Sequence, residues 1–165
     1  MSTKQSASAG QRWRFKRPEE AYQPRLFTTD AEVVRLGEGL LGCTLARADW
    51  THEAHLAATL YLLTRRPDID LDTELPGIIG RFNESVGGVN SDSEGYHETI
   101  TRTYLHGVRF FLREARPGAL TQQVNALLLS PAGGREWPLR FYSRELLFSV
   151  EARRRFAAPD VAPLP

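Results

Sequence analysis

The sequence predicts an all-α fold, a single-domain bundle of about six helices, and three observations lead to this prediction. Apolar residues recur at helical spacing in several successive segments. Capping residues precede these segments, and proline, glycine or basic residues follow them. Strand-like alternation is scarce, with residues 137–142 as the only mild candidate. The length of 165 residues and the hydrophobic content of 41% suit one compact domain.

The first two helices have clear boundary signals. Thr28 or Thr29 can cap a helix that ends near Cys43 and carries its apolar residues on one face. Asp49 or Thr51 can cap the second helix, which continues until Arg65-Arg66-Pro67 stops it. The basic residues in this last turn also suit the negative end of the helix dipole.

The third and fourth helices flank a loop rich in turn-forming residues. The third helix is expected to start at Asp72 or Thr73 and to be broken by Gly87-Gly88. A long amphipathic helix then runs from about Tyr96 to Ala115.

Two shorter helices are expected in the C-terminal third of the chain. One covers Leu120–Leu129, and the other covers Leu146–Phe156 with Ser143 as its cap. The tail from Pro159 to Pro165 is expected to be extended.

The net charge of +1 conceals an asymmetry along the chain. Residues 1–24 contain five Lys or Arg against two Glu, and we expect a flexible basic arm there, in front of a helical domain of residues 25–165. The domain contains sixteen basic and eighteen acidic residues, so its composition predicts no phosphate-binding surface. Nucleic acid is therefore not an expected partner.

The sequence also predicts a cytoplasmic protein without a membrane partner. No apolar run approaches the ~20 residues that a membrane span needs, and the first residues lack the apolar segment of a secretory signal. The single cysteine, Cys43, excludes an intrachain disulfide and a thiolate-rich metal site.

Three of the four histidines are expected to meet at one end of the bundle. The motif Trp50-Thr-His-Glu-Ala-His-Leu56 places His52 and His55 one turn apart on the inward face of the second helix. His97 shares the apolar face of the fourth helix. Because consecutive helices with short connections run antiparallel, the second and fourth helices should begin at the same end. His106 lies ~13 Å further along the fourth helix and on its opposite face, which excludes it.

These imidazoles predict a metal site. Burial and the positive end of a helix dipole disfavour protonation, and a neutral imidazole is a ligand for transition metals. We expect a divalent Zn, Fe, Mn or Ni ion bound by His52, His55 and His97. Such a site would support metal-assisted hydrolysis or oxidation of a small-molecule substrate. Glu98, which adjoins His97, leads as fourth ligand or general base, ahead of Glu53, Glu84 and Glu94.

Four further residues are expected near the same end and are candidates for binding the substrate: Arg81, Asn83, Tyr96 and Arg102. Either arginine could hold a substrate carboxylate. Two alternatives to the metal enzyme stay open. One is a metal-free protein that binds a small molecule with the same side chains. The other is a helical interaction module in which the histidines hold the bundle end together and the basic arm is displayed. The oligomeric state is not predicted.

Three stretches also carry a resemblance to known proteins. Trp50–Leu56, Gly95-Tyr-His-Glu-Thr-Ile-Thr101 and the closing Pro159–Leu164 resemble segments of a group of small, functionally uncharacterised microbial proteins. The resemblance covers most of residues 27–164, and the two histidine motifs are its distinctive part. It implies that these two motifs belong together, but it implies no reaction.

Overall fold

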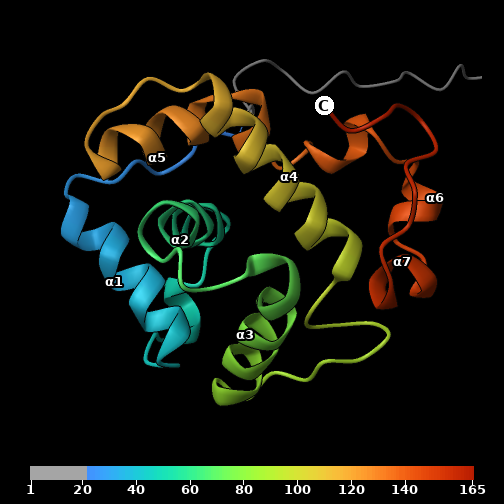
Figure 1. The fold of residues 1–165 in the computed structure, drawn as a ribbon. Coiled ribbons are helices and arrows are strands. Elements are labelled where there is room, and N and C mark those ends of the chain that lie inside the picture. Colours follow the sequence, from blue (N-terminus) through green and yellow to red (C-terminus); the bar gives the residue numbers. More distant parts are fainter. Residues whose placement is uncertain (1–21) are drawn as a thin grey trace, which may run out of the picture.

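A computed structural model describes residues 22–165 and confirms the all-α fold, because these residues contain seven α-helices and no strand. The helices are α1 Asp30–Leu41, α2 His52–Arg65, α3 Leu71–Ser85, α4 Glu98–Glu114, α5 Leu120–Leu129, α6 Arg144–Leu147 and α7 Val150–Arg154 (Figure 1). Short 3-10 turns lie at Arg47–Asp49, Pro131–Gly133 and Pro138–Arg140. None of the helices in this part of the chain is long and apolar enough to cross a membrane.

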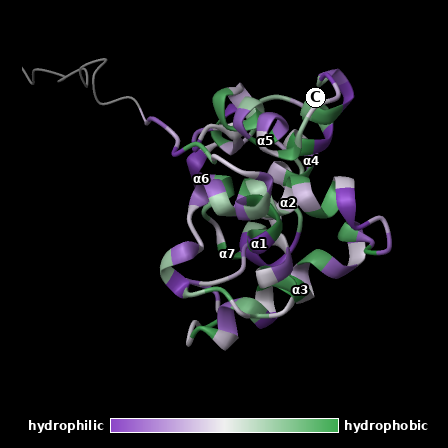
Figure 2. Cartoon of the chain, turned by 90° about the vertical axis from the view of Figure 1, so that its left-hand side faces the viewer, coloured by the Kyte–Doolittle hydropathy of each residue, from purple (hydrophilic) through white to green (hydrophobic). Residues whose placement is uncertain are grey.

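Helix α2 lies in the centre of the fold, with α1, α3, α4 and α5 around it (Figure 1). Eight of its fourteen residues are buried, and they cover most of its circumference, as expected for a helix enclosed by others. The outer helices carry a mixture of hydrophobic and hydrophilic residues (Figure 2). Helix α1 approaches α2 closely at Gly37, where a Cβ atom would lie 2.0 Å from Cδ1 of Tyr61.

The expected capping residues define most of the helix starts. The hydroxyl of Thr29 accepts from the backbone N–H of Glu32 and caps α1, and Thr51 caps α2 in the same way. Helix α3 begins slightly earlier than predicted, because the Asp70 carboxylate accepts from the N–H of Asp72 at 3.0 Å and serves as the cap.

The C-terminal third differs from the prediction in two places. The single helix expected over residues 146–156 is divided into α6 and α7, because Ser143 and Ser149 each cap a separate short helix. Residues 137–142 form a 3-10 turn that starts at Pro138, so the mild strand assignment there is wrong. Proline has no N–H to donate to a strand ladder, and at the start of a helical turn this loss has no consequence.

The C-terminal segment is fastened to the start of α4. The Thr99 hydroxyl donates to the carbonyl of Arg155 and accepts from the N–H of Ala157, both at 3.0 Å. Thr99 is fully buried, so these bonds replace water for its hydroxyl. This attachment places α7 beside the first turns of α4.

The predicted basic arm of residues 1–24 is described only at its end, since residues 1–21 lie outside the described part of the chain. Tyr22 contacts the helical domain: its hydroxyl donates to the Glu53 carboxylate, and its ring meets the ring of His52 edge-on at 5.8 Å. The Arg135 guanidinium lies over the face of the Tyr22 ring, 4.4 Å from its centre.

Candidate functional site

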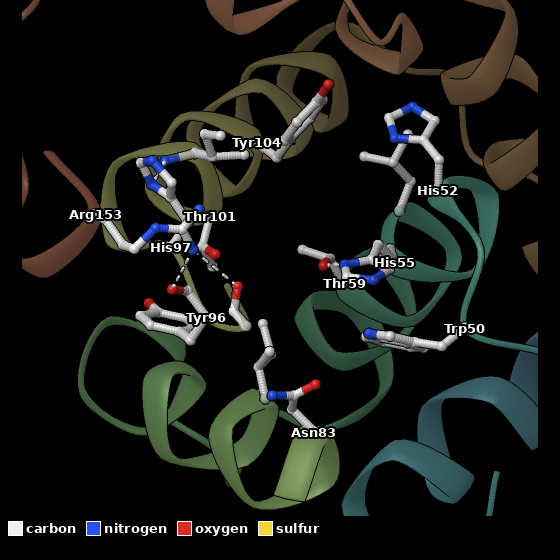
Figure 3. A pocket seen from close by; sticks show the side chains of 14 residues that line it. Trp50, His52, His55, Thr59, Asn83, Tyr96, His97, Thr101, Tyr104 and Arg153 are labelled. Atoms are coloured by element: carbon white, nitrogen blue, oxygen red, sulfur yellow. Dashed lines mark hydrogen bonds between the residues drawn. The ribbon is translucent and has the colours of Figure 1, made fainter. Parts of the chain in front are cut away.

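A pocket of about 460 Å³ opens where the first turns of α2 and α4 meet the last turn of α3 (Figure 3). Five of the residues singled out in the sequence line it: His52, His55, Asn83, Tyr96 and His97. The chain therefore brings three distant segments together at one place, in the arrangement that antiparallel packing of consecutive helices predicts. The volume lies within the range of about 300–1,000 Å³ that is usual for small-molecule sites.

His97 is the N-cap of α4 and is held by both of its ring nitrogens. Its Nε2–H donates to the carbonyl of Leu147 at 2.9 Å, and its Nδ1 accepts from the N–H of Ile100 at 3.3 Å. Both bonds require the neutral ring with the proton on Nε2. Burial lowers the pKa of His97, and the nearby Arg153 guanidinium lowers it further. The residue therefore joins α4 to α6 and has no nitrogen left for another partner.

His52 lies on the other side of the pocket (Figure 3). Its Nε2 is 2.8 Å from the carbonyl oxygen of Gly133, so that Nε2 carries the proton and donates. The rings of Tyr22 and Tyr104 pack edge-on against His52, with the Tyr104 ring centre 5.4 Å away. The Tyr104 hydroxyl donates to the backbone carbonyls of Gly134 and Arg135, at 3.0 and 3.2 Å. Hydrogen bonds thus join this side of the pocket to residues 133–135, at the end of the 3-10 turn Pro131–Gly133.

His55 differs from the other described histidines, because within residues 22–165 neither of its ring nitrogens has a hydrogen-bond partner. Its ring stacks on Trp50, with ring centres 4.0 Å apart and an angle of 32° between the planes. The residue is exposed to solvent through the pocket, although protein surrounds the ring densely on its other sides. This enclosure lowers the pKa of His55, and repulsion from His52 adds to the effect, so the ring is neutral at pH 7.

The three imidazoles share the pocket without facing one common point. His97 lies across the pocket from His52 and His55 (Figure 3). In the part of the chain that the structure describes, no three side chains of His, Cys, Asp or Glu are placed to hold one metal ion. The metal centre of His52, His55 and His97 is therefore not preformed, and it stays a prediction.

Glu98, the predicted catalytic residue, faces away from this pocket. Its carboxylate accepts from the Tyr96 hydroxyl at 2.6 Å and from Nε of Arg102 at 2.7 Å. Glu98 and Arg102 line a separate groove together with Asp72 and Arg109. Both oxygens of this carboxylate already accept a hydrogen bond, so neither is placed to take a proton from a molecule in the pocket.

The two arginines predicted to bind substrate are also directed elsewhere. Arg102 contacts Asp72 as well as Glu98, and Arg81 is exposed on the outer face of α3. Neither lines the pocket. His106, excluded at the sequence level, lies in the separate groove and contacts the carbonyl of Pro165.

Glu53, one of the alternative acids, is buried beneath Tyr22 at the start of α2. Burial alone would raise the pKa of its carboxyl group. Hydrogen bonds more than offset the effect of burial and lower the pKa of Glu53 to about 2. They come from the Tyr22 hydroxyl, from groups at the start of α2 and from the N–H of Arg25. Glu53 is thus a permanent anion that anchors the segment at Tyr22, outside the pocket.

Two residues at the pocket were not among the site residues predicted from the sequence. Arg153 reaches the pocket from α7, and its Nη1 donates to the carbonyls of Gly95 and Tyr96 at 3.2 and 3.1 Å. Gly95 forms the rim with a positive φ of 78°, and a Cβ there would lie 2.2 Å from the carbonyl oxygen of Val89. Glycine is required at this position for both reasons.

Comparison of the chain with protein-family models, with curated proteins and with solved structures finds no match.

Proposed function

We propose that this protein binds a small organic molecule in the pocket between the starts of α2 and α4, without a resident metal ion. The observation that carries the proposal is the pocket itself: about 460 Å³, with mostly apolar walls and a few polar groups that converge on it. His55 supports it, since its ring presents unused nitrogen atoms to the pocket beside the indole of Trp50.

The hydrogen bonds of the histidines favour this function over the metal enzyme. Binding a metal at His97 would require loss of its bond to the carbonyl of Leu147 or to the N–H of Ile100. Leaving a buried backbone group unpaired costs about 1–3 kcal/mol. Binding a molecule among the side chains as they stand requires neither loss.

The state of His55 favours binding over acid–base catalysis. A general base works best when its pKa lies near the working pH. Enclosure lowers the pKa of His55 to about 4, which makes the ring a weak base at pH 7. Its expected role is to accept a hydrogen bond from the ligand and to extend the flat surface of Trp50.

A pair of threonines in α2 allows a sharp test. Thr59 lines the pocket, whereas Thr64 is exposed, and each donates its hydroxyl to the carbonyl four residues earlier at 2.8 Å. T59F should fill the pocket, and T64F is the matched control. A screen of small organic acids, amines and neutral aromatics by ligand-observed NMR should find binders to the wild type and to T64F that T59F weakens by roughly ten-fold or more.

Two results would contradict the proposal. One is binding that T59F leaves unchanged, or no binding by any compound. The other is a stoichiometry of about one transition metal ion per chain in protein purified without an affinity tag, which would favour the metal enzyme instead. The interaction module predicts that deleting residues 1–21 abolishes capture of a partner, whereas ligand binding in the pocket should survive this deletion. The cytoplasmic location also stays a prediction, which cell fractionation tests.

A further inference from the structure

The described residues that line the pocket include one positively charged side chain and no negatively charged one. Among the described residues, Arg153 is the only Arg or Lys that lines it, and no Asp or Glu does so. His55 and His97 add no charge to this balance, because the pKa values of both are lowered and both rings are neutral at pH 7. The one arginine or lysine side chain that the pocket wall carries is therefore the guanidinium group of Arg153.

Arg153 is positioned by the backbone and not by a carboxylate. Its Nη1 donates to the carbonyls of Gly95 and Tyr96, which fixes the direction of the guanidinium plane. Within residues 22–165 no acidic group lies within 4 Å of it, whereas the neighbouring Arg154 is paired with Asp92. Nε and Nη2 of Arg153 have no partner in this part of the chain, so the edge that binds carboxylates best is available.

The opposite wall of the pocket is flat and largely apolar. Trp50 stacks on His55 there, and the ring of Phe82 packs edge-on against the indole, with ring centres 5.1 Å apart. Figure 3 shows Trp50 and His55 on one side of the pocket and Arg153 on the other. The Tyr104 hydroxyl is engaged by backbone carbonyls, so this residue offers the pocket mainly the carbons of its ring.

Resting on the proposed function, we propose that the ligand is an organic acid with a flat apolar body. Its carboxylate pairs with the free edge of Arg153, and its body lies against Trp50 and His55. A planar carboxylate matches the planar fork of arginine in two parallel hydrogen bonds. The first turns of α2 and α4 also border the pocket, and the positive ends of their dipoles favour an anion.

Matched pairs of acids and amides test the proposal on the full chain. The probes are indole-3-acetate, 3-phenylpropionate and 2-naphthoate, each compared with its primary amide by isothermal titration calorimetry at low and high salt. The acid should bind at least roughly ten-fold more tightly than its amide, because only the acid forms a charge-assisted pair with Arg153. High salt should weaken the binding of the acid and leave the affinity for the amide unchanged.

Substitutions at two arginines separate the guanidinium from general charge. R153M should remove the preference for the acid and leave the amide within about two-fold, which also shows that the pocket is intact. R155M, at an exposed arginine that follows α7, should keep the preference. R153K serves as a second variant if R153M does not fold; it keeps the charge but lacks the fork, and it should show a reduced preference.

The outcomes distinguish this inference from the proposed function. Binding of acid and amide with equal affinity to the wild type, or a preference for the acid that neither R153M nor R153K reduces, overturns the proposal of an organic acid while the proposed function of the pocket stands. If only neutral or cationic compounds bind, and T59F weakens their binding, the proposal of an organic acid is overturned and the proposed function stands. Absence of any binding that T59F affects overturns both.

Discussion

Replacing His97 should show that this residue is part of the framework of the fold. H97A removes the cap of α4, which costs about 0.5–2 kcal/mol, typically about 1. It also leaves the carbonyl of Leu147 without its partner, which costs about 1–3 kcal/mol for a buried group. Loss of the ring surface that faces the pocket adds little to the loss of unfolding free energy, because water can enter the space that the ring leaves. The expected loss of unfolding free energy is about 2–4 kcal/mol.

H97N separates the two contributions. Asparagine is a good N-cap, so this variant should keep the bond to the N–H of Ile100 and lose only the bond to Leu147. Its expected loss is about 1–3 kcal/mol, less than that of H97A by the cost of the cap, which is typically about 1 kcal/mol.

Urea denaturation followed by circular dichroism measures both values, and thermal melting should show a fall of about 3 °C per kcal/mol for a domain of this size. H106A, at a histidine in the separate groove, is the control and should lose less than H97A. A loss below about 0.5 kcal/mol for H97A, or equal losses for H97A and H97N, would refute the capping role.

Three further predictions concern pH, the pocket rim and Glu98. The pKa values of His55 and His97 are lowered in the folded state, so the unfolded chain binds more protons at acidic pH. The contribution of the two neutral rings to the unfolding free energy should be fully present above pH ~6.5 and should fall as the pH drops toward about 4. A urea midpoint that does not change from pH 7 to 4 would contradict this. G95A should destabilise the rim by about 1–3 kcal/mol and weaken acid probes more than amides, because its carbonyl positions Arg153; unchanged affinities in calorimetry would argue against that positioning. E98Q should leave ligand affinity in the pocket within about two-fold and cost about 1 kcal/mol of stability, whereas loss of binding would show that Glu98 belongs to the site, as predicted from the sequence.

The fold and the position of the pocket were predictable because local signals determine them. Thr29 and Thr51 cap helices at the expected places, and the antiparallel order of consecutive helices brings His52 and His97 to one end. The division of α6 from α7 also has a local signal, since Ser149 is followed by Glu151 in the first turn of a new helix.

The roles of the side chains were less predictable because they depend on contacts between distant segments. His97 was expected in the first turn of α4, but as the N-cap it turns its ring toward Leu147 in α6. Glu98 is the first residue of the helix and turns to the neighbouring face, where Arg102 pairs with it. Arg153 lines the pocket from α7, and the bonds of Thr99 to the chain after α7 help to hold that helix beside α4; no spacing in the sequence indicates this attachment.

Nitrogen NMR of the histidine side chains tests most directly whether the pocket histidines serve a binding pocket or a metal centre. The spectrum is recorded at pH 7 on protein treated with a chelator, then with one equivalent of zinc, and separately with indole-3-acetate. We predict that His97 shows the neutral ring with its proton on Nε2 in all three samples, and that His55 shifts with the acid. Simultaneous shifts of His52, His55 and His97 that saturate at one zinc ion per chain would contradict this account.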